Sequence, residues 1–86
     1  MSQLQGTLAY RAPELFRGQL PTTKAGIYSL GITLWSLKEQ QLPYVGQNNF
    51  IIVYQVVSQH LRPGTGFEDL WLPDPVRRPE AYNIVI

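Results

Sequence analysis

Apolar residues recur at helical spacing through the middle of this chain of 86 residues. Their period of three to four residues predicts a helix over residues 23–40. One stripe along this helix consists of Ile27, Leu30, Leu34 and Leu37. The adjoining faces carry Tyr28, Ile32 and Trp35. A helix that is apolar on nearly every side is typical of a buried central helix, so we expect other parts of the fold to cover it.

Shorter elements are predicted near both ends of the chain. Residues 11–16 favour a short helix, because Pro13 falls near its first turn, where a missing N–H costs little, and Gly18 would end it. Residues 64–66 predict a loop. The tail, residues 74–86, has room for one short helix. Its predicted inner face consists of Ala81, Ile84 and Val85.

The segment at residues 47–60 is ambiguous. The β-branched and aromatic residues at 50–54 favour a strand. The length of the segment, and Asn48 or Asn49 as a possible N-cap, favour a helix instead. We predict a helix, which makes the fold class mainly α.

Composition narrows the classes of partner. Seven Lys and Arg against six Asp and Glu give a net charge of +1 without a basic run, so we expect no nucleic-acid and no membrane partner. The chain has no cysteine, and His60 is its one histidine, which leaves no Cys- or His-based metal site. Neither a signal peptide nor a membrane span is predicted. We therefore expect a cytoplasmic protein.

The N-terminal motif carries the strongest functional information. Residues 6–14 read GTLAYRAPE, which resembles the end of the activation segment of eukaryotic protein kinases, GTxxYxAPE, in its serine/threonine form. The resemblance implies that Thr7 contacts the catalytic aspartate and lysine. It further implies that Leu4 and Leu8 line the pocket for the substrate residue after the phosphorylated one. The alternative is a capped loop that merely leads into a helix.

Three later segments follow the order of the same family. Residues 24–35 resemble the start of its central helix, LPY at 42–44 and LRP at 61–63 flank the next helix, and WLPDPVRRP at 71–79 resembles the WxxDPxxRP motif. Within the family the likeness is strongest to the Mos subfamily, as in RAPEL at 11–15 and ITLW at 32–35. The resemblance implies one partial domain over residues 1–86. That domain is a piece of the large lobe, from the end of the activation segment through helices around a central hydrophobic helix.

The first and last motifs imply a buried contact between them. In the family, the glutamate of the Ala-Pro-Glu motif pairs with the arginine of the Arg-Pro motif, which correspond here to Glu14 and Arg78. Removing one partner of such a pair leaves a buried charge uncompensated, at a cost of about 3–5 kcal/mol. Arg77 is the alternative partner in a shifted register, and two separate exposed charges are the other alternative.

The chain also departs from the family pattern. Gly26 stands where the central helix has an aspartate, so a hydrogen-bond acceptor for the catalytic loop is lost. The connection between Pro63 and Trp71 is too short for the helix that the family has there. The chain contains neither a Gly-rich loop nor the lysine, aspartates and asparagine that phosphoryl transfer requires. ATP and Mg²⁺ are implied for the parent family, whereas this chain is expected to hold no cofactor or metal.

These observations predict a fragment of a Mos-like serine/threonine kinase that is inactive alone. A truncated transcript, an incomplete gene model or a degenerate copy would each produce one. Its expected partners are the remainder of a kinase domain and a protein substrate or docking partner. The alternative function is a non-catalytic interaction module that binds through exposed apolar residues of the segment at 47–60. A small helical protein without kinase ancestry is a third possibility.

Overall fold

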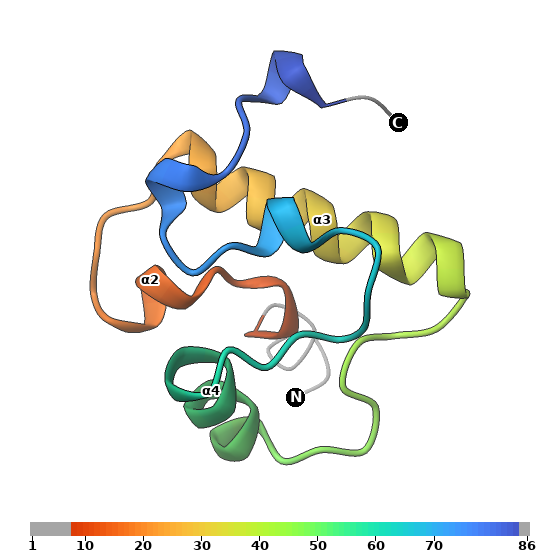
Figure 1. Ribbon diagram of the computed structural model, residues 1–86. Helices are drawn as coiled ribbons and strands as arrows, with labels where there is room; N and C mark the ends of the chain where they lie inside the picture. The colour runs from red at the N-terminus through yellow and green to blue at the C-terminus, as the bar shows by residue number, and fades with distance from the viewer. Residues whose placement is uncertain (1–7, 85–86) are drawn as a thin grey trace.

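The computed structural model describes residues 8–84, in which shorter helical elements pack on one side of a long helix and leave its other side open (Figure 1). Residues 8–10 are helical, and three further α-helices follow them: α2 (Pro13–Phe16), α3 (Thr23–Glu39) and α4 (Asn49–Ser58). Three 3₁₀ turns follow them: η1 (Glu68–Trp71), η2 (Pro75–Arg77) and η3 (Ala81–Asn83). Within residues 8–84 no strand occurs. The mainly α fold is therefore confirmed, including a helix in the ambiguous segment.

Local sequence sets both ends of α3. The Thr22 side chain accepts a hydrogen bond from the Lys24 N–H at 3.2 Å, which satisfies one of the free donors of the first turn. At the other end Gln40 adopts a left-handed conformation with φ 55° and its N–H bonds to the Ser36 carbonyl. The helix therefore covers the range that its periodicity predicts.

The buried face of α3 differs from the predicted stripe. Of that stripe only Ile27 is fully buried, and Leu37 is 70% exposed. The covered face lies roughly a quarter of a turn away on a helix of 3.6 residues per turn. It runs through Lys24, Tyr28, Gly31 and Trp35. The reason is tertiary: η1 and η2 pack against this face of α3, and apolar spacing alone does not say which apolar face they choose.

Two glycines allow two tryptophans to approach closely. A Cβ at Gly31 would lie 2.5 Å from Nε1 of Trp71, so the bare backbone of α3 lets the indole of η1 pack against it. A Cβ at Gly64 would likewise overlap the Trp35 indole. Trp35 and Trp71 are both buried in the main core. Side-chain volume at either glycine would push the connection at 63–71 away from α3.

Helix α4 belongs to a second, smaller cluster. The Asn48 side chain caps it by accepting hydrogen bonds from the N–H groups of Phe50 and Ile51 at 2.8 and 3.4 Å. Ile52 and Val56 are buried with Tyr44, and the helix packs against α2. In the part of the chain that the structure describes, no helix combines the length and apolar character needed to cross a membrane.

The tail forms less helix than its pattern predicts. Between residues 74 and 84 the tail has two single 3₁₀ turns, η2 and η3, and Ala81 on η3 is exposed, so its placement on an inner face was wrong. Ile84 packs against the main core, and Val85 lies outside the described residues. One turn after Pro79 is too short to present several residues to the core on one side.

Candidate functional site

The candidate site is the N-terminal motif and the elements that hold it. Leu4 and Thr7 lie outside the described residues, so the structure begins at the third predicted platform residue, Leu8. Leu8 is half-buried, and its carbonyl accepts a hydrogen bond from the Arg11 N–H at 3.2 Å. The motif then enters α2, where Pro13 at the first turn and the buried Glu14 follow.

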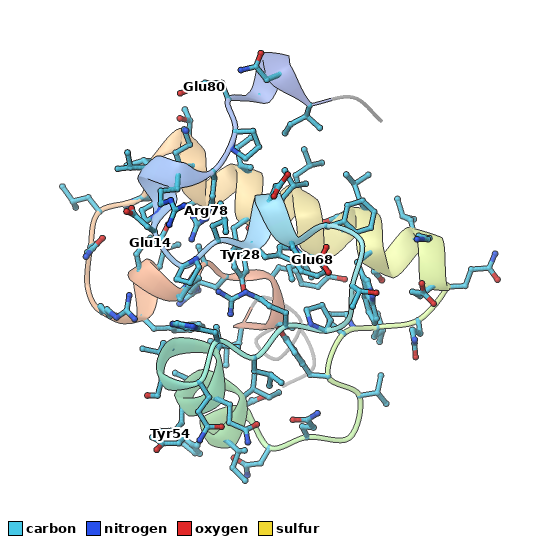
Figure 2. All side chains as sticks on the ribbon, in the orientation of Figure 1. Glu14, Tyr28, Tyr54, Glu68, Arg78 and Glu80 are labelled. Carbon is cyan, nitrogen blue, oxygen red and sulfur yellow. The ribbon has the colours of Figure 1, made fainter. Side chains whose placement is uncertain are left out.

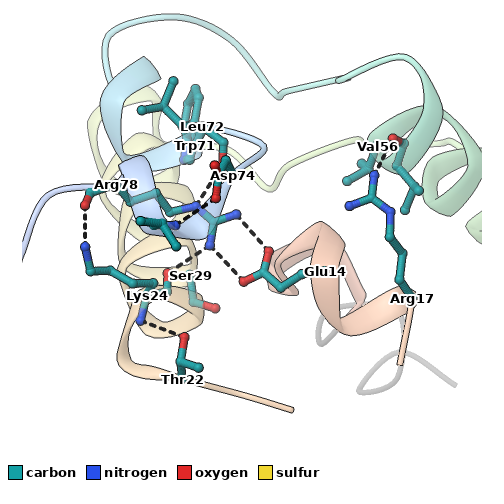
Figure 3. A network of polar contacts seen from close by, with 12 residues as sticks. Glu14, Arg17, Thr22, Lys24, Ser29, Val56, Trp71, Leu72, Asp74 and Arg78 are labelled. Carbon is teal, nitrogen blue, oxygen red and sulfur yellow. Dashed lines mark hydrogen bonds and ion pairs between the residues drawn. The ribbon is translucent and has the colours of Figure 1, made fainter. Parts of the chain in front are cut away.

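A buried ion pair joins this motif to the last one (Figures 2 and 3). Arg78 donates from its two terminal nitrogens to the two carboxylate oxygens of Glu14, at 2.9 and 2.8 Å. The two residues are only 2% and 3% exposed. Bidentate geometry of this kind is the strongest arrangement that a guanidinium and a carboxylate can form. Arg77, the alternative partner, is exposed on η2.

The rest of the Arg78 guanidinium is also satisfied. Its Nε donates to the Leu72 carbonyl at 2.8 Å, and one terminal nitrogen donates to the Lys24 carbonyl at 3.0 Å. The group lies 5.0 Å from the centre of the Tyr28 ring, within range of a cation–π contact. One residue therefore ties together α2, the first turn of α3 and the segment after η1.

Electrostatics of the pair favour its charged form. Burial raises the pKa of Glu14, but hydrogen bonds and the charge of Arg78 outweigh burial and hold that pKa below its ordinary value of 4.5. Tyr28 lies beneath the guanidinium, and there the effect of burial prevails. Burial raises the pKa of Tyr28, because ionisation would place a second anion in the core.

Two residues that the sequence argument did not single out also hold the site. The Ser29 hydroxyl donates to the Tyr10 carbonyl at 2.7 Å, which fixes the N-terminal motif to α3. The Lys24 ammonium donates to the Arg78 carbonyl at 2.5 Å and lies 3.3 Å from a carboxylate oxygen of Glu80. Lys24 and Tyr28 are four residues apart, so helical spacing alone predicts that they lie on one face of α3. The sequence does not predict which distant residues they contact.

Gly26, the position of the lost aspartate, faces open space. It is exposed near the start of α3, and a Cβ built there would meet nothing within 4 Å. The structure therefore has no steric need for glycine at this position.

The site does not fit ATP or Mg²⁺. Over residues 8–84 no group of three or more metal-ligating side chains gathers. The acidic residues that could be imagined as ligands have local roles: Asp74 accepts from the Val76 N–H at 3.0 Å, and Glu68 accepts from the Gly66 N–H at 3.0 Å.

Helices around α3, and a buried pair that joins the Ala-Pro-Glu motif to the Arg-Pro motif, define a segment of the large lobe of a serine/threonine protein kinase. No family model matches the chain. The chain is 48% identical over 79 residues to the serine/threonine-protein kinase mos of Patiria pectinifera. This alignment covers 90% of the chain and 22% of the Patiria protein. The chain is a Mos-like kinase segment.

Two vertebrate relatives agree. The serine/threonine-protein kinase mos of Xenopus laevis is 36% identical over 95 residues, covering 93% of this chain and 26% of that protein. The Sus scrofa proto-oncogene serine/threonine-protein kinase mos is 36% identical over 99 residues, covering 96% of this chain and 28% of that protein. The chain thus spans about a quarter of the length of these curated relatives. Both alignments are longer than its 86 residues, so these relatives contain residues without a counterpart here.

Proposed function

We propose that residues 1–86 form the part of a kinase domain that runs from the substrate-binding loop to the terminal Arg-Pro motif. The parent protein would transfer the ATP γ-phosphoryl group to a Ser or Thr hydroxyl of a protein substrate. The bidentate Glu14–Arg78 pair carries this proposal, because it connects the two motifs that bound the segment across 64 residues of sequence. A chance occurrence of either motif would not require the other.

Within that domain the segment would serve as the platform for the substrate peptide. Leu4, Thr7 and Leu8 are the proposed contacts, with the leucines lining the apolar pocket and Thr7 meeting the catalytic residues. The backbone two residues after Leu8 supports this role, because Ser29 holds it through the Tyr10 carbonyl. A platform that positions a peptide must itself be fixed, since small displacements of reacting groups lower the rate steeply.

The chain alone is proposed to be inert. Positioning and charge stabilisation of the phosphates account for most of the catalysis in this reaction, and the residues that perform them do not occur in this sequence. ATP and Mg²⁺ would be bound by the remainder of the kinase domain, which is the first partner that we propose. A protein substrate is the second, and the cytoplasm is the proposed location.

A chimera tests the platform proposal. The corresponding stretch of the Patiria pectinifera kinase is replaced by this chain, and phosphoryl transfer to a protein substrate is measured. We expect a reduced but measurable rate, and a higher rate for the chimera with Gly26→Asp, which restores the acceptor for the catalytic loop. Gly26→Ala is the matched control, because it changes helix propensity without adding an acceptor.

Two outcomes would contradict the proposal. A folded chimera without transfer, with and without Gly26→Asp, would show that this segment cannot serve as the platform. Turnover of ATP onto a peptide by the 86-residue chain alone would show that the segment is not inert.

A second candidate function is a non-catalytic interaction module, which would also suit a truncated or degenerate copy of the gene. Exposed apolar residues on α4 favour it: Phe50 is 86% exposed and Tyr54 is 61% exposed. Single exposed apolar residues are ordinary, whereas several on one helix face mark a contact surface. Loss of a bound partner on Phe50→Asp would support this function.

A further inference from the structure

The hydroxyl of Ser29 bonds outside its own helix. A serine or threonine in the middle of a helix can donate to the carbonyl four residues earlier. Thr33 on α3 does so, and its hydroxyl donates to the Ser29 carbonyl at 3.0 Å. The Ser29 hydroxyl instead donates to the Tyr10 carbonyl at 2.7 Å, across 19 residues of sequence. Serine is a weaker helix former than alanine, so this position serves a tertiary contact and not the helix.

The acceptor of this bond is a carbonyl that its own segment leaves without a donor. Residues 8–10 are helical, and Tyr10 is the last of them before the bend at Arg11. The carbonyls of a last helical turn have no donor within the helix. The Arg11 N–H donates to the Leu8 carbonyl at 3.2 Å, which leaves the Tyr10 carbonyl to Ser29. Because the contact is partly buried, water can replace the lost hydroxyl only in part.

The N-terminal motif is therefore held at two points. The buried one is the Glu14–Arg78 pair. The other is the bond from Ser29 to the Tyr10 carbonyl, two residues after Leu8. In the part of the chain that the structure describes, this bond is the one hydrogen bond that joins α3 directly to the motif. It acts on the end of the motif that leads back to the proposed peptide contacts.

We propose that Ser29 is a positioning residue for the peptide substrate. It acts through the backbone that follows the proposed contacts Leu4, Thr7 and Leu8, and not by touching the peptide. The inference rests on the proposed function and adds to it a residue outside the motif that determines how well the platform holds a peptide. Small displacements of bound groups lower rates steeply. Loss of this hydroxyl should therefore affect use of the peptide more than it affects folding.

Steady-state kinetics of the chimera with Gly26→Asp test this role, with a synthetic peptide that carries one serine followed by leucine. Ser29→Ala should lower kcat/KM for the peptide about fivefold, the worth of one hydrogen bond, mainly through a higher peptide KM. The KM for ATP should not change. Ser29→Thr keeps a hydroxyl and should restore most of the loss. A merely structural role would reduce the active fraction, which lowers kcat and leaves both KM values as they are.

Ser36→Ala is the matched control. The Ser36 hydroxyl also donates to a backbone carbonyl, that of Gln41 at 2.6 Å, but this contact is exposed and lies at the other end of α3. Its loss should leave the peptide KM unchanged. Equal peptide KM values for Ser29→Ala and Ser36→Ala would overturn the role of Ser29, while transfer by the chimera would still uphold the proposed function. No transfer by any folded chimera would instead contradict the proposed function, and the inference with it.

Hydrogen exchange of the 86-residue chain adds a readout that needs no activity. The Arg11 amide reports on the motif, because it donates to the Leu8 carbonyl. Ser29→Ala should speed its exchange about fivefold and leave the central turns of α3 as protected as before. Ser36→Ala should not change the exchange of the Arg11 amide. If this amide exchanges at one rate with and without the Ser29 hydroxyl, Ser29 does not hold the motif and the inference is wrong.

Discussion

Arg78 distributes its guanidinium over a carboxylate, two carbonyls and an aromatic ring, so one residue connects α2, α3 and the segment after η1. A buried ion pair is not in itself a large source of stability, because both charges lose their hydration on folding. Removing only one partner of the pair is costly for the same reason, because the other charge stays buried.

Truncating Glu14 should destabilise the fold strongly. Glu14→Ala leaves the Arg78 charge buried without its anion, and the free energy of unfolding should fall by about 3–5 kcal/mol. Glu80→Ala is the matched control, because its carboxylate is half exposed beside Lys24 and such pairs contribute at most about 1 kcal/mol. Urea denaturation of both variants measures the difference. Similar small losses in both would contradict the buried pair.

Stability should fall at both extremes of pH. Because the pKa of Glu14 is lower in the folded chain, its contribution is complete above the unfolded value of 4.5 and is lost as acid titrates the folded carboxyl below it. Tyr28 and Tyr44 have raised pKa values through burial, so their contribution is complete below the ordinary value of 10 and is lost in alkali. Denaturation midpoints measured from acid to alkaline pH check both limbs. An acid limb that Glu14→Gln leaves unchanged would speak against this assignment.

The two glycines of α3 should respond in opposite ways to alanine. Gly26→Ala meets nothing within 4 Å and should raise stability by about 0.5–1 kcal/mol through helix propensity. Gly31→Ala puts its methyl 2.5 Å from Nε1 of Trp71 and should cost about 1–3 kcal/mol through overpacking. Thermal unfolding compares the pair directly. The same sign for both would show that Trp71 does not pack against Gly31.

At the scale of elements, α4 shows how a cap decides between helix and strand. Its residues favour a strand by propensity, yet Asn48 satisfies two N–H groups of the first turn and the next turn buries Ile52 and Val56 against α2. Burial on one side of a helix and a satisfied N-terminus outweigh intrinsic preferences that span about 1 kcal/mol.

Removing the cap should therefore weaken α4. Asn48→Ala should lower stability by about 1 kcal/mol, since it leaves the Phe50 and Ile51 N–H groups without their acceptor. Asn49→Ala is the neighbouring control, because Asn49 is the first helical residue and does not cap the helix. The loss of helical circular dichroism on urea addition compares them. An equal effect of both changes would place the cap elsewhere.

At the scale of the whole molecule, the fold contains two apolar clusters of unequal size. The larger one surrounds α3 and holds both tryptophans, and the smaller one holds α4 with Tyr44. Arg62 lies between them: it donates to the Trp71 and Leu61 carbonyls at 2.9 and 2.7 Å and lies over the Tyr28 ring. Few buried residues support the smaller cluster, so it should open first.

Hydrogen exchange should resolve this difference. The amides of α4 should exchange at lower protection than those of the central turns of α3, because α4 rests on a small cluster that can open without unfolding the larger one. Exchange followed by mass spectrometry or NMR measures both helices in one sample. Equal protection would show that the two clusters unfold as one cooperative unit.

Several residues were readable from the sequence because their evidence is local. The N-cap of α4, the end of α2 near Gly18 and the motif at 6–14 depend on neighbours within a few positions. The pairing of Glu14 with Arg78 came from the resemblance and not from spacing, because no local pattern links residues 64 positions apart. Leu4 and Thr7 lie outside the described residues, so their roles stay predictions.

The sequence by itself determined that this chain is mainly helical and that it is a Mos-like kinase segment without the residues of phosphoryl transfer. Only the tertiary structure decided which face of α3 is buried and that Arg78, not Arg77, pairs with Glu14. It also decided that Gly31 and Gly64 are the positions where Trp71 and Trp35 approach the backbone. The physical reason is range. Periodicity, caps and motifs act over a few residues, whereas burial and ion pairing depend on which distant segment arrives at a surface.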